Sequence, residues 1–126
     1  MPAILYTVRA TCVSLQQRGR FLSWLSPNHI AGVLKGGATS ARIILPLPDD
    51  RSGQTPAGQQ AGTAPTAPSD TAPAIVETQY VFPSRKAFDD YIRDHAPALR
   101  ADGLKHFPPE SGITYERQTA EIAAEL

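Results

Sequence analysis

The chain reads Phe88-Asp-Asp-Tyr-Ile-Arg-Asp-His-Ala-Pro-Ala-Leu-Arg-Ala-Asp-Gly-Leu-Lys-His-Phe107 over residues 88–107, and this stretch decides the fold class. Phe88, Tyr91 and Ile92 recur at the spacing of one helical face, which predicts an amphipathic helix. Pro97 marks a hinge, because proline favours the first position of a new helix and disfavours helix in the residue before it. Two helices joined by a hinge are typical of a small α+β domain, but they identify no chemistry.

Alternation of apolar and polar residues predicts four strands around this stretch. Two helices are expected between the first and second strands, with Ser26 as a cap and Pro27 at the first position of the second helix. The predicted strands are residues 4–11, 39–45, 75–82 and 112–119, and the two helices before the second strand are residues 15–25 and 28–35.

The order of these elements predicts the fold. Strand, helix, strand, strand, helix, strand is the split βαβ arrangement of a ferredoxin-like sandwich, a four-stranded antiparallel sheet with its helices on one face. The other face must then meet water, a ligand or another sheet. The two halves also look alike, because Phe21 and Trp24 recur as Phe88 and Tyr91 at one constant offset, as an internal two-fold predicts.

A single domain over residues 1–126 is expected, with a disordered insertion rich in Pro, Ala and Gly at about residues 48–73. The insertion leaves roughly 100 residues to form a core, which is marginal for one chain alone. A second copy of the domain would supply a further buried face. We therefore expect a homodimer in which two sheets pack together, as in a dimeric α/β barrel.

Charge and cysteine content exclude several classes of protein. The formal net charge is zero, which argues against a nucleic-acid or anionic-membrane partner. The segment Met1–Pro48 is basic and contains neither Asp nor Glu, so opposite charges could pair between two copies or within one. The lone Cys12 forms no intrachain disulfide and is expected to be a small buried hydrophobe. No signal peptide or membrane span is visible, which predicts a cytoplasmic protein.

Five side chains are candidates for a binding or catalytic site. His29 lies where the first helix breaks and can exchange protons near neutrality, or it caps the short helix. Arg42 within a strand is expected to point to solvent, to a carboxylate or to an anionic ligand, because an unpaired buried charge is costly. His95 could bind a ligand or end its helix. Tyr80 and Tyr115 donate hydroxyls into a cavity or simply pack. Histidine spacing predicts no metal site, and no cofactor motif or nucleophile motif is present.

Several short segments carry a resemblance to a known family. They are Ile4-Leu5-Tyr6-Thr7-Val8, Trp24-Leu25, His29-Ile30, Val33-Leu34, Thr39-Ser40-Ala41-Arg42, Gln79-Tyr80, and above all His95-Ala96-Pro97-Ala98-Leu99-Arg100 with Gly103-Leu104 and Phe107. In these segments the chain resembles the bacterial domain-of-unknown-function family 4286. The resemblance implies a ferredoxin-like chain similar to the dimeric α/β-barrel proteins, and it brings no established activity. The insertion and Ser26-Pro27 depart from the family pattern.

Three functions follow as expectations. The first is a homodimeric ferredoxin-like domain that binds a small molecule in a cavity between sheet and helices, near His29, Arg42 and Tyr80. The second is a cofactor-independent dimeric α/β-barrel enzyme of the monooxygenase, isomerase or decarboxylase type, with His29 as base, Arg42 as anion partner and Tyr80 as hydrogen-bond donor. It requires these three side chains to converge on one concave space. The third is a protein-interaction module that uses a sheet edge or the loop at 49–72.

Overall fold

The computed structural model of the chain describes residues 2–47 and 74–126. The insertion expected at about residues 48–73 lies outside the described residues, and so does the loop version of the interaction module. None of the described helices combines the length and the apolar character needed to cross a membrane. The elements in chain order are β1 (Ile4–Cys12), α1 (Leu15–Trp24), the kinked helical segment η1 (Leu25–His29), α2 (Ile30–Lys35), β2 (Ser40–Ile44), β3 (Ala74–Phe82), α4 (Arg85–Asp94), α5 (Ala96–His106), the 3₁₀ turn η3 (Pro109–Ser111) and β4 (Thr114–Glu121).

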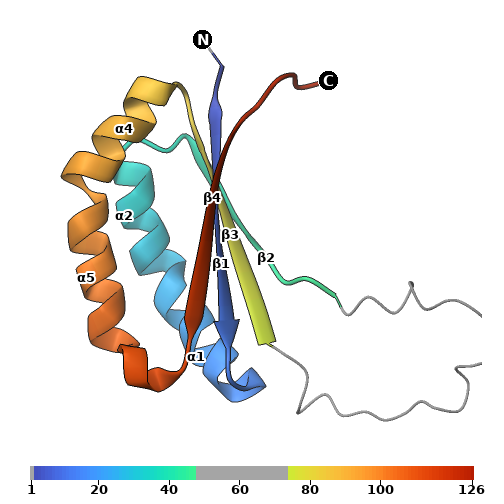
Figure 1. The fold of residues 1–126 in the computed structure, drawn as a ribbon, viewed down its shortest axis with the longest axis vertical. Helices are drawn as coiled ribbons and strands as arrows, with labels where there is room; N and C mark the ends of the chain where they lie inside the picture. Colours follow the sequence, from blue (N-terminus) through green and yellow to red (C-terminus); the bar gives the residue numbers. More distant parts are fainter. Residues whose placement is uncertain (1, 48–73) are drawn as a thin grey trace, which may run out of the picture.

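The four strands form one antiparallel sheet in the order β2-β3-β1-β4. All the helices lie on one side of it (Figure 1). The predicted ferredoxin-like α+β sandwich is therefore confirmed. Successive residues of a strand point to opposite faces, so Tyr6 and its partner Tyr80 lie on the face toward the helices, called here the helix face. Leu5 and its partner Val81 lie on the opposite face, the outer face.

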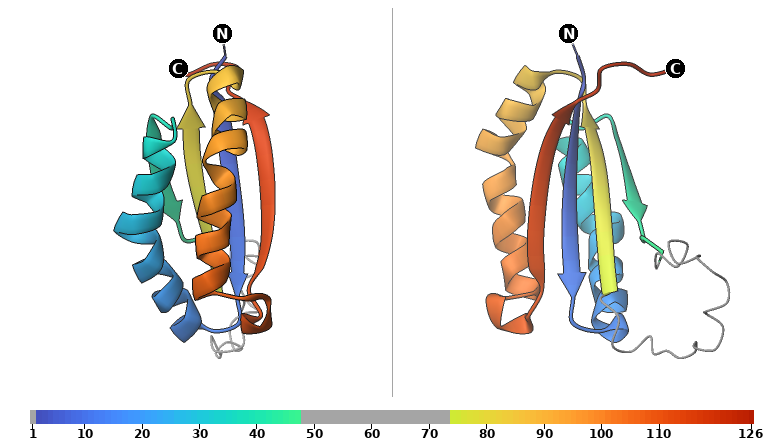
Figure 2. Two further views of the ribbon diagram at one scale, coloured as in Figure 1. Left: turned by 90° about the vertical axis from the view of Figure 1, so that its left-hand side faces the viewer. Right: turned by 45° about the vertical axis from the view of Figure 1, so that its right-hand side comes forward.

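The outer face is not covered by any helix or strand that the structure describes (Figure 2). It is mixed in character, since half-buried Leu5 and Val81 lie near the start of β1 while Arg9 and Glu77, further along, form a salt bridge of 3.0 Å. A face of this kind is neither a polar surface nor an internal core. It is the face for which the sequence predicts a second sheet.

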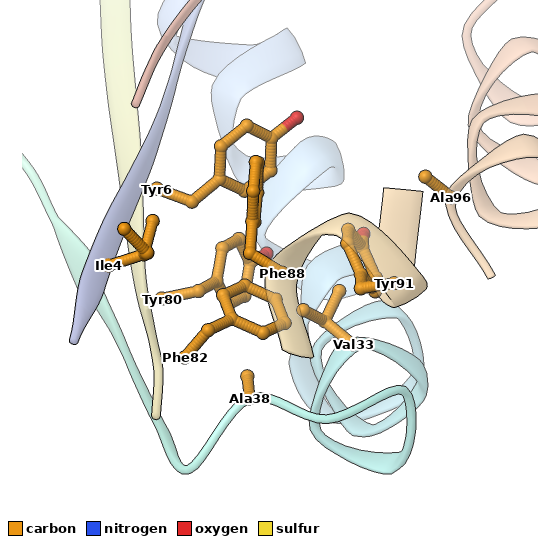
Figure 3. Close-up of a cluster of buried hydrophobic side chains, with 9 residues drawn as sticks. All are labelled: Ile4, Tyr6, Val33, Ala38, Tyr80, Phe82, Phe88, Tyr91 and Ala96. Carbon is orange, nitrogen blue, oxygen red and sulfur yellow. The ribbon is translucent and has the colours of Figure 1, made fainter. Parts of the chain in front are cut away.

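The core between sheet and helices divides into two clusters. One lies around Phe82, which is fully buried and contacts Phe88 and Tyr91 with ring centroids 5.3 and 5.0 Å apart (Figure 3). The other lies around Phe21 and includes Cys12, which is buried as predicted. The first cluster consists of Ile4, Tyr6, Val33, Ala38, Tyr80, Phe82, Phe88, Tyr91 and Ala96, and the second of Ala10, Cys12, Phe21, Leu25, Ala74, Val76, Phe107 and Ile113.

The two halves of the chain repeat the same cap at the start of a helix. Ser14 caps α1 by accepting a hydrogen bond from the Gln17 amide at 3.0 Å, and Ser84 caps α4 from the Ala87 amide at 3.1 Å. The strands before these caps, β1 and β3, have equal lengths, and their starts are separated by the same offset as the two caps. The sequence comparison matched Phe21 to Phe88, which is an offset three residues smaller than that of the two caps. This displaced match arose because residues three apart lie on the same face of a helix.

Gln17 ties the start of α1 to the entry of β4. It is only 5% exposed, and both ends of its amide are used. The side-chain Oε1 accepts from the Val13 amide at 2.8 Å, and Nε2 donates to the Ser111 carbonyl at 3.0 Å. This one side chain therefore satisfies backbone groups from both ends of the sequence, as buried polar groups require.

The break between the first two helices lies at Ser26, as expected. Ser26 has extended backbone angles (φ −119°, ψ 126°) and is the one residue of 25–29 with non-helical angles, so helical backbone resumes at Pro27 and continues into α2. The Ser26–Pro27 peptide is cis. Neither η1 nor α2 begins with a side-chain capping hydrogen bond, so the expected cap by Ser26 is not seen among the described residues. The break brings Trp24 and His29 together with their rings stacked at 4.4 Å.

Candidate functional site

A cavity of about 300 Å³ lies between the sheet and the helices. Members of both core clusters line it, including Tyr6 and Tyr91 of the first and Phe21 and Leu25 of the second. It is therefore a gap between two packed regions. Among the described residues its lining includes no carboxylate.

The floor of the cavity is the helix face of the three strands β3, β1 and β4. The register places Thr78 and Arg117 on either side of Val8, and Tyr80 opposite Tyr6. Alternation along each strand keeps all of these residues on one face. Strand pairing alone thus builds a floor with aromatic, aliphatic and hydroxyl groups.

The roof of the cavity comes from α5 and the turn after α1. Close approach of these helices depends on Gly103, where an added Cβ would lie 3.3 Å from the Trp24 ring. The Trp24 indole also donates to an Asp102 carboxylate oxygen at 3.3 Å, which fixes the ring against α5. Trp24 therefore forms a rigid part of the wall.

His29 carries an unpaired polar atom at this wall. Its Nδ1 is buried and has no hydrogen-bond partner among the described residues, while its ring lines the cavity. Burial lowers the pKa of His29, and the charge of Asp102 opposes that effect only in part. A neutral ring that leaves Nδ1 unprotonated avoids burying an unpaired N–H, so the proton belongs on Nε2.

Tyr80 and Tyr91 on the inner wall stay protonated. Burial raises the pKa of Tyr80 to about 12, and burial also raises the pKa of Tyr91. Tyr6 and Tyr80 extend from neighbouring strands toward the helices, as Figure 3 shows. The inner wall therefore offers hydroxyl groups but no charge.

The mouth of the cavity is marked by its exposed lining residues Arg100, Leu104 and Arg117. Arg100 donates to the Tyr6 hydroxyl at 3.3 Å, and Arg117 lies over the Tyr115 ring at 5.5 Å. Neither guanidinium forms a salt bridge within residues 2–47 and 74–126. Two positive charges thus stand at the entrance of an uncharged chamber.

The structure brings together three of the five predicted site residues. His29, Tyr80 and Tyr115 line the cavity. Arg42 lies on the outer face. Its partner in β3 is Gln79, which neighbours Tyr80 in the strand and therefore points to the opposite face from Tyr80. His95 is exposed and is the C-cap of α4, the position that the capping alternative gave it, and its ring stacks near that of Tyr91. Neither Arg42 nor His95 lines the cavity.

The enzymatic alternative required His29, Arg42 and Tyr80 to converge, and this convergence does not occur. The two arginines that do line the cavity are Arg100 and Arg117, which sequence reasoning missed. A signal for Arg117 existed, since it alternates in step with Tyr115 along β4. Among the described residues, no group of three or more His, Cys, Asp or Glu side chains could hold a metal ion.

Comparison with solved structures supports the fold. A dimeric ferredoxin-like protein from an uncultured marine organism is 10% identical with a TM-score of 0.64, covering 98% of this chain and 97% of that chain. A second such protein, also from an uncultured marine organism, has 10% identity and a TM-score of 0.59 over 100% of both chains. The de novo designed protein Foldit4 has 8% identity and a TM-score of 0.50, covering 94% of this chain and 96% of that chain.

Sequence comparison gives the family. Among curated protein sequences, none matches the chain. The family model described as "Domain of unknown function (DUF4286)" matches residues 3–116, which include all the helices and the first three strands of the sheet. That match confirms the resemblance seen in the segments around Tyr6, His29 and His95. The chain belongs to the DUF4286 family of domains of unknown function.

Proposed function

We propose that this domain binds a small molecule in the cavity between sheet and helices and works as a homodimer. The observation that carries the binding proposal is a cavity of about 300 Å³ with mostly apolar walls and a few polar groups. This size is at the lower end of the range for ligand sites. The unpaired Nδ1 of His29 adds a polar atom whose partner the described chain does not supply.

The open mouth of the cavity argues against a simple packing defect. A packing defect is an enclosed gap, whereas this cavity opens at a mouth lined by exposed Arg100, Leu104 and Arg117. In the absence of a ligand the open space is filled by water. A ligand with an apolar body would release that water from aromatic walls.

The outer face supports the homodimer. It is not covered by the described chain, and half-buried Leu5 and Val81 lie side by side on it near the start of β1. Two proteins of similar fold are described as dimeric ferredoxin-like proteins. Packing of two such sheets would hide the outer faces of both copies and leave each cavity, on the opposite face, open.

The binding proposal is tested by filling the cavity. Gly103→Leu adds a side chain toward the Trp24 wall, while Ala101→Leu places the same final side chain at an exposed position of the same helix. Fragments of one or two rings are screened by ligand-observed NMR. We expect binders to the wild type and to Ala101→Leu that are lost in Gly103→Leu. Fragments that bind all three proteins equally, or none of them, would overturn the proposal.

The homodimer is tested by light scattering behind size exclusion, at low and high salt. Leu5→Glu places a charge beside Val81 on the outer face, and Leu15→Glu is the matched change at an exposed position of α1. We expect a dimer for the wild type and for Leu15→Glu, and a monomer for Leu5→Glu. A monomeric wild type at micromolar concentration would contradict the proposal. A dimer lost at high salt would instead indicate pairing of the two oppositely charged halves.

A further inference from the structure

We infer that the ligand is an aromatic carboxylate, bound with its ring against the Trp24–His29 wall and its carboxylate at Arg100 and Arg117. This inference rests on the proposed binding function and specifies the chemical class of the ligand. It depends on three features of the cavity, namely the charge at its mouth, the neutrality of its interior and the aromatic character of its walls.

The charge at the mouth selects an anion. Arg100 and Arg117 both line the cavity and are both exposed there, and the described lining contains no acidic side chain to balance them. Other arginines of the fold are paired differently, since Arg9 meets Glu77 at 3.0 Å and Arg93 meets Asp94 at 2.9 Å. A guanidinium presents donors in a planar fork that matches the two oxygens of a carboxylate.

Much of the donor capacity at the mouth is left over. A guanidinium has five N–H groups, and Arg100 spends one of them on the Tyr6 hydroxyl, a long bond of 3.3 Å. Arg117 lies over the Tyr115 ring, which leaves the edge of its guanidinium open. Both groups can therefore turn donors toward a carboxylate without breaking a salt bridge within the described chain.

The interior excludes the charged end of such a ligand. His29 is neutral with its Nδ1 unpaired, and Tyr80 and Tyr91 keep their protons. A carboxylate pushed among these groups would lose its hydration without meeting a cation. The ligand is thus oriented, with its carboxylate at the mouth and its apolar part inside.

The walls favour a flat ring as that apolar part. Trp24 and His29 stack with their ring centroids 4.4 Å apart and their planes at 29°, and both line the cavity. The ring centroid of Phe21 lies 5.5 Å from that of Trp24, and the ring centroid of Tyr115 lies 6.3 Å from that of Phe21. The aromatic lining therefore continues from the wall to the floor of the cavity. Offset and edge-to-face contacts with these rings add specificity beyond the area buried.

The test uses two probes that differ in charge but little in shape. 2-Naphthoate is the anion, and 2-naphthamide is its neutral counterpart. Affinity is measured by isothermal titration calorimetry. Location is read from the indole N–H resonance of Trp24, which is the one tryptophan of the chain. We expect 2-naphthoate to shift this resonance and to bind the wild type at least about tenfold more tightly than 2-naphthamide, since charge-assisted hydrogen bonds are the strong ones.

Three variants locate the charge effect. Arg100→Gln and Arg117→Gln each remove one guanidinium from the mouth, and Arg42→Gln removes one from the outer face as the control for net charge. We expect the affinity for 2-naphthoate to fall about tenfold in each mouth variant and to stay unchanged in Arg42→Gln. The affinity for 2-naphthamide should stay unchanged in all three. Thermal melting checks that each variant is folded.

The outcomes separate this inference from the proposal beneath it. If both probes shift the Trp24 resonance with equal affinity, the cavity binds small molecules but does not select an anion, and the inference is wrong. The same holds if Arg42→Gln weakens 2-naphthoate as much as the mouth variants do. If neither probe shifts the resonance at millimolar concentration, both the inference and the binding function are overturned.

Discussion

Replacing Gln17 by alanine tests whether one buried amide holds the two ends of the fold together. The change removes the bond from the Val13 amide at 2.8 Å and the bond to the Ser111 carbonyl at 3.0 Å. Each bond contributes about 1 kcal/mol, and a buried group left unpaired costs a further ~1–3 kcal/mol. Val13 is 61% exposed, so water can replace the partner of its amide. The net loss is therefore about 2 kcal/mol rather than more.

The assay is urea denaturation followed by circular dichroism. Gln16→Ala is the matched control, because Gln16 precedes Gln17 on the same helical turn and is exposed. We expect the free energy of unfolding to fall by about 2 kcal/mol in Gln17→Ala and by less than about 0.5 kcal/mol in Gln16→Ala. Equal stability of the two variants would show that the Gln17 bonds contribute nothing net, and the account of this tie would be refuted.

Three further predictions concern the site and the core. Burial lowers the pKa of His29, so the unfolded chain takes up a proton on this side chain before the folded chain does as the pH falls below about 6.5. The free energy of unfolding of the wild type should therefore fall relative to that of His29→Gln by up to about 1.4 kcal/mol per pH unit. Parallel curves of stability against pH, measured by urea melts from acid to neutral pH, would contradict this. Phe82→Ala should cost about 3–5 kcal/mol, because Phe82 is fully buried among aromatic rings, and a loss below about 2 kcal/mol by the same melts would argue against a tightly packed cluster. Ser84→Ala should cost about 1 kcal/mol through loss of the α4 cap, with Ser84→Thr retaining most of it, and equal losses in both variants would rule out a capping role.

The overall fold was accessible from sequence because its signals are local. Strand alternation and helix punctuation depend on neighbouring residues, and they gave the element order that the sheet confirms. The spacing of the internal repeat was not resolved. A helix presents similar residues every three or four positions, so Phe21 could be matched to Phe88 as well as to Tyr91. The capping residues Ser14 and Ser84 distinguish the two alignments, since a cap occurs once per helix.

The site was less accessible because it depends on pairing between distant strands. Alternation correctly separated Arg42 from Ala41, but only the register with β3 shows that Ala41 lies on the helix face beside Tyr80. Arg100 was missed for another reason. The sequence of α5 lacks a clear apolar stripe, and its Leu104 is 52% exposed at the cavity mouth. Periodicity therefore could not say which side of that helix meets the sheet.

The central position of β1 has an evolutionary consequence. This strand is hydrogen-bonded along both edges, to β3 over its whole length and to β4 over all but its last residue. Inserting one residue near the start of β1 would exchange the two faces over the rest of the strand, so that Arg9 would replace Ala10 inside and Tyr6 would turn outward. Substitutions that respect the alternation would leave the pairing intact. Members of the family should therefore differ in β1 and β3 by substitutions far more often than by insertions or deletions. Alignments of relatives should run without gaps through both strands.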